Sequence, residues 1–189
     1  GVLWFQLVVR GIPVHVANMG TGANAIDAAY RVVGALRKLE DAWNADAKGH
    51  PLFGGHYHPL NLNIGKIEGG DWASSVPAWC KIDCRIAILP GRSAAEAAKA
   101  IETCVADFAR TDSFLANNPP DVVFNGFFAE GYELERGSDA ENTLAAAHQA
   151  VTGSVLEDRL VTAYLDARVY ALYGKMPVLN YGCIAEGYH

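Results

Sequence analysis

The stretch Val76-Pro77-Ala78-Trp79-Cys80-Lys81-Ile82-Asp83-Cys84-Arg85-Ile86-Ala87-Ile88 places an apolar side chain at every second position. Successive side chains of a β-strand point to opposite faces of the sheet, so this alternation predicts a strand. Lys81, Asp83 and Arg85 fall together on the other face. We expect the apolar face to pack in a core and the polar face to meet solvent or a ligand.

Three further strands are predicted around this stretch. Residues 3–9 are rich in aromatic and branched side chains and end at a turn over residues 10–13. Residues 60–64 alternate in the same way until Gly65 upsets the parity, which predicts a β-bulge. Residues 122–128 form the fourth predicted strand.

Two amphipathic helices are predicted between these strands. Apolar residues recur at intervals of three and four from Ile26 to Trp43, and Asn24 is placed to cap this helix. A capping box at residues 93–96 opens the second helix. The order strand, helix, strand, strand, helix, strand predicts an α+β fold. We expect a two-layer, ferredoxin-like sandwich of a four-stranded antiparallel sheet and two helices over residues 1–132.

The remaining residues, 133–189, are predicted to form a separate segment. Ser138 and Glu141 mark the start of a third helix by the same capping logic, and strands are expected near residues 160–164 and 177–181. These elements are too few to complete a core by themselves. The sequence also begins, at Gly1, in the middle of a predicted strand. Both features suggest a fragment of a longer protein.

Composition narrows the class of partner. The chain has 189 residues, of which 51% are hydrophobic, and its net charge is −6. That composition is typical of a packed globular protein, and the acidity argues against a nucleic-acid surface such as an RNA-binding sheet. No apolar run approaches the roughly 20 residues of a membrane span. Four cysteines without dense pairing indicate free thiols, so we expect a cytoplasmic protein.

Several side chains could carry chemistry. His56 and His58 could share a zinc ion if a third ligand came near, although a solvated loop is the simpler interpretation. Cys80 and Cys84 lie on the apolar face of the predicted strand, which favours packing over metal binding. His15 follows the turn at residues 10–13, where a side chain can project from a strand end.

Arg85 leaves two possibilities open. It could form a salt bridge across the sheet, or it could hold a carboxylate with its guanidinium group.

Ordered motifs then identify a family. Residues 4–15, ending in Arg-Gly-Ile-Pro-Val-His, and residues 22–26, Gly-Ala-Asn-Ala-Ile, resemble the lid motif of the dinuclear-zinc hydrolases. These enzymes include aminoacylase, acetylornithine deacetylase and succinyl-diaminopimelate desuccinylase. Further motifs follow in the family's order at residues 61–65, 69–72, 75–80, 83–85, 90–91, 166–168 and 181–189. The resemblance extends almost from end to end and is strongest toward the deacetylase and desuccinylase branch.

The resemblance implies a role for particular residues. The lid histidine of the family reaches into the active site of the partner subunit and stabilises the oxyanion, and it matches His15. A second histidine, near the C-terminus, completes the coordination of one zinc ion. The implied assignments are catalytic His15, substrate-binding Asn24 and Arg85, metal-binding His189, and possible active-site neighbours Asp166 and Arg168.

The resemblance also implies an activity for the parent protein. It would be a homodimeric amidohydrolase, with two zinc or cobalt ions, that removes an acyl group from an N-acyl amino acid. Residues 1–132 would be its lid and dimerisation domain, and residues 133–189 an incomplete C-terminal part of its catalytic domain. In this family the other metal ligands and the glutamate base precede the lid, so we expect the fragment to bind zinc weakly and to be inactive. A dipeptidase or carboxypeptidase of the same family, or a stand-alone dimerisation module, is the alternative.

Overall fold

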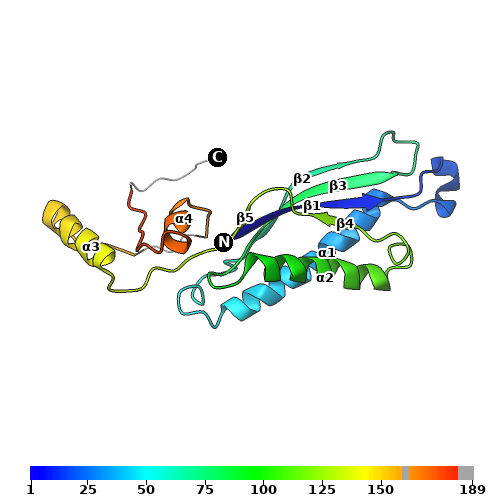
Figure 1. Cartoon of the computed structure of the whole chain (residues 1–189). Coiled ribbons are helices and arrows are strands. Elements are labelled where there is room, and N and C mark those ends of the chain that lie inside the picture. Colours follow the sequence, from blue (N-terminus) through cyan, green and yellow to red (C-terminus); the bar gives the residue numbers. More distant parts are fainter. Residues whose placement is uncertain (159–161, 183–189) are drawn as a thin grey trace.

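The computed structural model describes residues 1–158 and 162–182 and contains an antiparallel sheet with the strand order β2-β3-β1-β4 (Figure 1). A short fifth strand, β5, pairs with the start of β1. The bounds are β1 (Val2–Arg10), β2 (Leu62–Gly69), β3 (Trp79–Ala87), β4 (Asp121–Val123) and β5 (Phe128–Ala129). The predicted α+β architecture is therefore confirmed, with β5 as an addition.

The single strand predicted at residues 122–128 is wrong in its extent. The chain pairs with β1 at β4, bends away, and returns at β5. The bend passes directly over the Trp4 indole, because a Cβ atom on Gly126 would lie 2.9 Å from the indole Cε3. Only a residue without a side chain fits there, and continuous pairing is lost.

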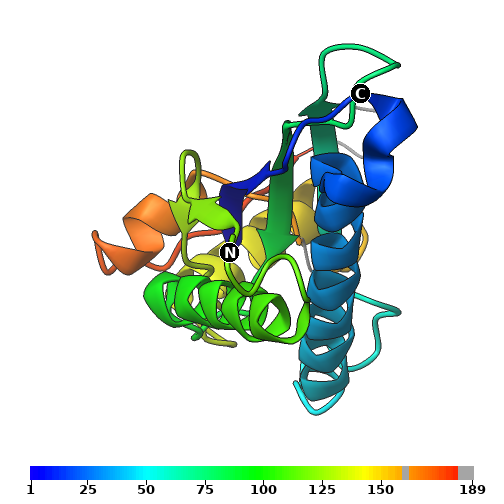
Figure 2. The same ribbon diagram turned by 90° about the vertical axis from the view of Figure 1, so that its right-hand side faces the viewer.

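Two helices, α1 (Ala25–Ala47) and α2 (Ala94–Thr111), cover one face of the sheet (Figures 1 and 2). The Asn24 side chain caps α1 and the Ser93 side chain caps α2, as predicted. A carboxylate does bind the start of α2, but it comes from Glu130, which accepts from the Ala94 amide at 3.0 Å. The end of β5 is thereby attached to α2.

The core lies between the helices and the inner faces of β1 and β3. Its strand residues alternate as the sequence predicts; they are Leu3, Phe5, Leu7 and Val9 on β1 and Cys80, Ile82, Cys84 and Ile86 on β3. Burial of each large apolar side chain contributes roughly 1.5–3 kcal/mol. Cys80 and Cys84 are packing residues, and burial raises the pKa of the Cys84 thiol to about 12. The register of β2 shifts between Ile64 and Lys66, which confirms the bulge.

The segment after β5 has little core of its own. It contains α3 (Asp139–Thr152), predicted from its capping residues, and the short α4 (Ala167–Leu172), and both lie beyond the end of the sheet where β1 begins (Figure 1). Ala167 is the only buried hydrophobic residue described after residue 132. The strand predicted at residues 177–181 is wrong, and residues 162–164 are not a strand either. Neither segment pairs with a strand of the described sheet.

A 3-10 helix, η1 (Val16–Thr21), follows β1 and forms the tip of the domain with the turn over residues 70–75. Within residues 1–158 and 162–182, no helix is long and apolar enough to cross a membrane.

Candidate functional site

His15 lies at the tip, where β1 has ended and η1 begins. Its Nδ1 atom accepts a hydrogen bond from the Ala17 amide at 3.2 Å, and its backbone bridges to Ser75. A ring nitrogen that accepts carries no proton, so the neutral imidazole holds its proton on Nε2. The exposed ring is thus a hydrogen-bond donor at the tip.

Asn24 lies at the same tip, and the helix cap already uses its oxygen. Its Oδ1 atom accepts from the Ile26 and Asp27 amides at 2.9 and 3.2 Å. The NH2 group of the side chain remains as the donor. Asn24 borders a shallow groove of about 520 Å³ together with the exposed side chains of Met19 and Trp72.

Arg85 lies at the other end of the sheet, opposite Trp4 of β1. Among the described residues Arg85 forms no salt bridge across the sheet, and Asp83 accepts from the Gln6 amide group at 2.8 Å. Arg85 donates to the backbone oxygen of Thr162 at 3.3 Å, and burial lowers the pKa of its guanidinium. A partly buried cation without a carboxylate partner among the described residues is suited to bind an anion.

Arg168 lies at the junction between the sheet and the tail. Its Nε atom donates to the backbone oxygen of Glu130 at 2.6 Å, and its guanidinium lies 5.9 and 5.7 Å from the ring centroids of Tyr164 and Tyr173. These contacts hold the side chain in place. Asp166 precedes α4 without capping it, and the structure gives it no site partner among the described residues.

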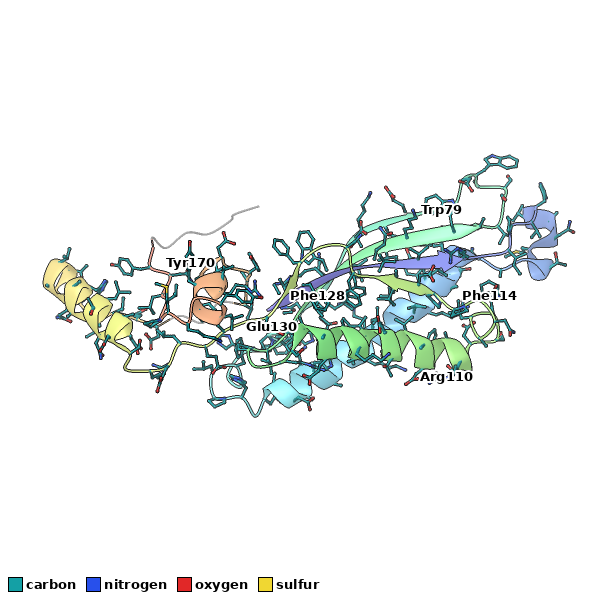
Figure 3. All side chains as sticks on the ribbon, viewed as in Figure 1. Trp79, Arg110, Phe114, Phe128, Glu130 and Tyr170 are labelled. Carbon is teal, nitrogen blue, oxygen red and sulfur yellow. The ribbon has the colours of Figure 1, made fainter. Side chains whose placement is uncertain are left out.

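Arg85 and Arg168 both lie at the junction between the sheet and the tail. Arg85 donates to the Thr162 backbone oxygen, and Thr162 lines the same cavity of about 560 Å³ as Arg168. Both guanidiniums therefore add positive potential to this junction, where Figure 3 labels Glu130. Two such groups can bind a carboxylate through charge-assisted hydrogen bonds.

The predicted site residues form two separate groups in one chain. His15 and Asn24 lie beyond the Arg10 end of β1, whereas Arg85 faces Trp4. Six residues of strand span roughly 20 Å. One chain alone therefore does not place His15 beside Arg85. The predicted metal ligand His189 lies outside the described residues.

The histidine pair at residues 56 and 58 is part of a loop. His58 hydrogen-bonds Asn61 and Asn44 at 3.2 and 3.3 Å, and His56 is exposed. In the described part of the chain, no group of three His, Cys, Asp or Glu side chains could hold a metal ion. The described residues alone thus do not fit a zinc centre.

Sequence patterns did not reveal Glu130, Tyr164 and Tyr173 as neighbours of the arginines. Glu130 reaches Arg168 and the start of α2 through contacts between distant segments, whereas Tyr164 and Tyr173 contact Arg168 from nearby in the sequence. The only local signal was the closeness of Tyr164 and Tyr173 to the 166–168 motif.

Comparisons with known proteins agree with this fold. N-formyl-4-amino-5-aminomethyl-2-methylpyrimidine deformylase from Halalkalibacterium halodurans is 24% identical over 177 residues, which are 89% of this chain and 40% of that protein. A probable carboxypeptidase from Aspergillus clavatus is 32% identical over 119 residues, or 59% of this chain and 24% of that protein. The chain thus spans less than half the length of either relative.

Solved structures give the same architecture. Aminopeptidase PepT from Bacillus cereus superposes with a TM-score of 0.62 at 19% identity, covering 92% of this chain and 41% of that one. A tripeptidase from Staphylococcus aureus superposes with a TM-score of 0.66 at 11% identity, covering 93% and 41%. The sequence-family model of the peptidase dimerisation domain, a domain of M20 hydrolases, matches residues 1–113. Because that match covers more than half of the sequence, the chain belongs to the peptidase dimerisation domain family.

Proposed function

We propose that this chain is the pairing lid, with part of the catalytic domain, of a homodimeric amide hydrolase. The observation that carries this proposal is the separation of His15 from Arg85 and Arg168 within one chain. A site that contains both a donor to the oxyanion and the arginines that bind a carboxylate therefore needs residues from two copies of the chain. The names of the deformylase and carboxypeptidase relatives, which denote action at an amide, support the same reaction class.

In the proposed site each group has one task. The Nε2 proton of His15 stabilises the oxyanion that develops on the amide carbonyl, a contribution of about 3–4 kcal/mol. Arg85 and Arg168 hold the carboxylate of an N-acyl amino acid, and the Asn24 NH2 group orients its backbone. Zinc dependence and ligation by His189 stay predictions. The division of the chain near residue 132 is also a proposal, supported by the scarcity of buried residues beyond it.

Pairing of two copies is proposed to use the edge of the sheet formed by β2 together with α1. β2 is one of the two outer strands of the sheet, and most of its residues are exposed. Exposed edges pair readily, and twofold dimers are the commonest symmetric assemblies.

The second candidate is a peptidase that recognises the free C-terminal carboxylate of its peptide substrate. The carboxypeptidase relative favours it, and the arginine pair would serve either substrate. Parallel assays of N-acyl amino acids and of dipeptides with the full-length protein separate the two.

Subunit mixing tests the shared site. His15→Ala and Arg85→Ala variants of the full-length protein should each be nearly inactive. After dissociation and mixing, half of the dimers are mixed, and each mixed dimer has one intact site. Activity should therefore recover to about a quarter of the unsubstituted level, as the twofold symmetry of a shared site requires. Mixing without any recovery would place both residues in one subunit's site and refute the proposal.

A further inference from the structure

Three aromatic side chains from distant segments form a continuous row between the sheet and the tail. The Trp4 and Phe127 rings meet edge to face with their centroids 4.9 Å apart, and the Phe127 and Tyr164 centroids are 4.4 Å apart. Contacts at these spacings are favourable for aromatic pairs. The row nevertheless leaves much of its surface open, since Trp4 is 45% exposed and Phe127 is 40% exposed.

The backbone around Gly126 holds Phe127 in this aromatic row. The Trp4 amide donates to the Phe127 oxygen at 2.8 Å, and Gly126 lies directly against the indole. Phe127 therefore belongs to the bend that interrupts strand pairing between β4 and β5. This anchoring gives the exposed ring a fixed position.

A guanidinium group lies at each end of the aromatic row. Trp4 lies opposite Arg85, and because the Trp4 amide points to Phe127 the two residues are a non-hydrogen-bonded pair of β1 and β3. In such a pair the Cα atoms are about 4.5 Å apart and the side chains lie close together on one face. At the other end, the Arg168 guanidinium lies 5.9 Å from the Tyr164 centroid, and both residues line the cavity of about 560 Å³.

Exposed aromatic rings beside Arg85, which has no carboxylate partner among the described residues, match the composition of a small-molecule site. Such sites are lined mainly by apolar and aromatic side chains, with a few charged groups that fix the orientation of the ligand. An aromatic ring that packs on Trp4 and Phe127 gains contact area, and a carboxylate on the same molecule can pair with Arg85. The surface thus suits a ligand that carries both groups close together.

We propose that Trp4 and Phe127 bind the aromatic side chain of the amino acid whose α-carboxylate Arg85 holds. The inference rests on the proposed function, which assigns the carboxylate to Arg85 and Arg168. The carboxylate and the side chain are bonded to the same α-carbon, so a carboxylate at Arg85 brings the side chain within reach of the two rings. The substrate class is therefore an N-acyl amino acid with an aromatic side chain, and a peptide with an aromatic C-terminal residue would present the same two groups.

Substrate selectivity of the full-length protein tests this inference. The kcat/KM for N-acetyl-phenylalanine should exceed that for N-acetyl-alanine about 10- to 100-fold, as expected from burial of a phenyl group. Phe127→Leu removes the ring and keeps an apolar side chain, so this ratio should fall about 3- to 10-fold, mainly through a higher KM for the aromatic substrate. Phe127→Tyr keeps the ring and should retain the ratio.

Phe128→Leu is the matched control for the selectivity ratio. Phe128 is 47% exposed and adjacent in the sequence, but its ring packs against Phe124 with the centroids 5.6 Å apart. Because both substrates are measured on one preparation, a loss of folded protein cancels in the ratio. Equal ratios in Phe127→Leu and Phe128→Leu would overturn the inference.

Ligand binding without turnover gives a second measurement. The proposed binding groups belong to one chain, so the 189-residue chain can be titrated with 3-phenylpropanoate and with propanoate while its amide chemical shifts are recorded. 3-Phenylpropanoate should bind at least about 10-fold more tightly than propanoate and should shift the amides of Trp4, Arg85 and Phe127. The uncharged 3-phenylpropanamide should bind more weakly than 3-phenylpropanoate, because it cannot form an ion pair with Arg85.

The two measurements distinguish failure of this inference from failure of the proposed function. A protein that binds 3-phenylpropanoate at Trp4 but hydrolyses no acyl amino acid or dipeptide would overturn the proposed function and leave the aromatic subsite. Equal binding of the two carboxylates, or hydrolysis without a preference for aromatic side chains, would overturn the subsite alone.

Discussion

Replacing Glu40 with alanine removes the carboxylate that binds the Leu62 amide from within the structure. Glu40 is only 4% exposed, so water cannot readily take its place. Loss of hydrogen bonds to a charged group costs about 1.5–3 kcal/mol, and an unsatisfied buried amide costs about 1–3 kcal/mol more. The freed Arg37 side chain is 47% exposed and can be hydrated, so it adds little. We expect Glu40→Ala to lower the free energy of unfolding by about 3 kcal/mol.

Urea unfolding followed by circular dichroism measures this loss. Glu40→Gln is the matched variant, because its amide oxygen can still accept from Leu62 while the charge is lost, and it should cost about 1 kcal/mol. Asp41→Ala, at a side chain that is 76% exposed, should change stability by no more than about 0.5 kcal/mol. A Glu40→Ala variant as stable as Asp41→Ala would refute the stabilising role of the hydrogen bond between Glu40 and the Leu62 amide.

Three more outcomes follow from the described contacts. The pKa of the Cys84 thiol is raised by burial from 9.0 to about 12, so the native state keeps a proton that the unfolded state releases. Stability should therefore be complete below pH 9.0 and fall as the pH rises toward 12, and Cys84→Ala should flatten this dependence in urea titrations. Asn24→Ala removes the cap of α1 and should cost about 1 kcal/mol in the same assay. His15→Ala in the full-length protein should cut turnover about 100- to 1,000-fold without changing metal content or unfolding, as measured by steady-state kinetics and metal analysis.

The sheet and its helices were predictable because local patterns decide them. The alternation along residues 76–88 places Cys80 and Cys84 correctly in the core, and Gly65 marks the bulge by parity alone. Asn24 and Ser138 cap helices with their own side chains. In each case the deciding contacts lie within a few residues along the chain.

The failures share a different physical cause. The strand at residues 122–128 divides because Gly126 must pass over Trp4, a contact between distant segments. The expected strand at residues 177–181 pairs with no described strand, which no local pattern can reveal. A charged residue in a helix, such as Glu40, is typically exposed to solvent. Glu40 is nevertheless buried, because its carboxylate accepts a hydrogen bond from the Leu62 amide. Long-range contacts of this kind also determine the surroundings of Arg168.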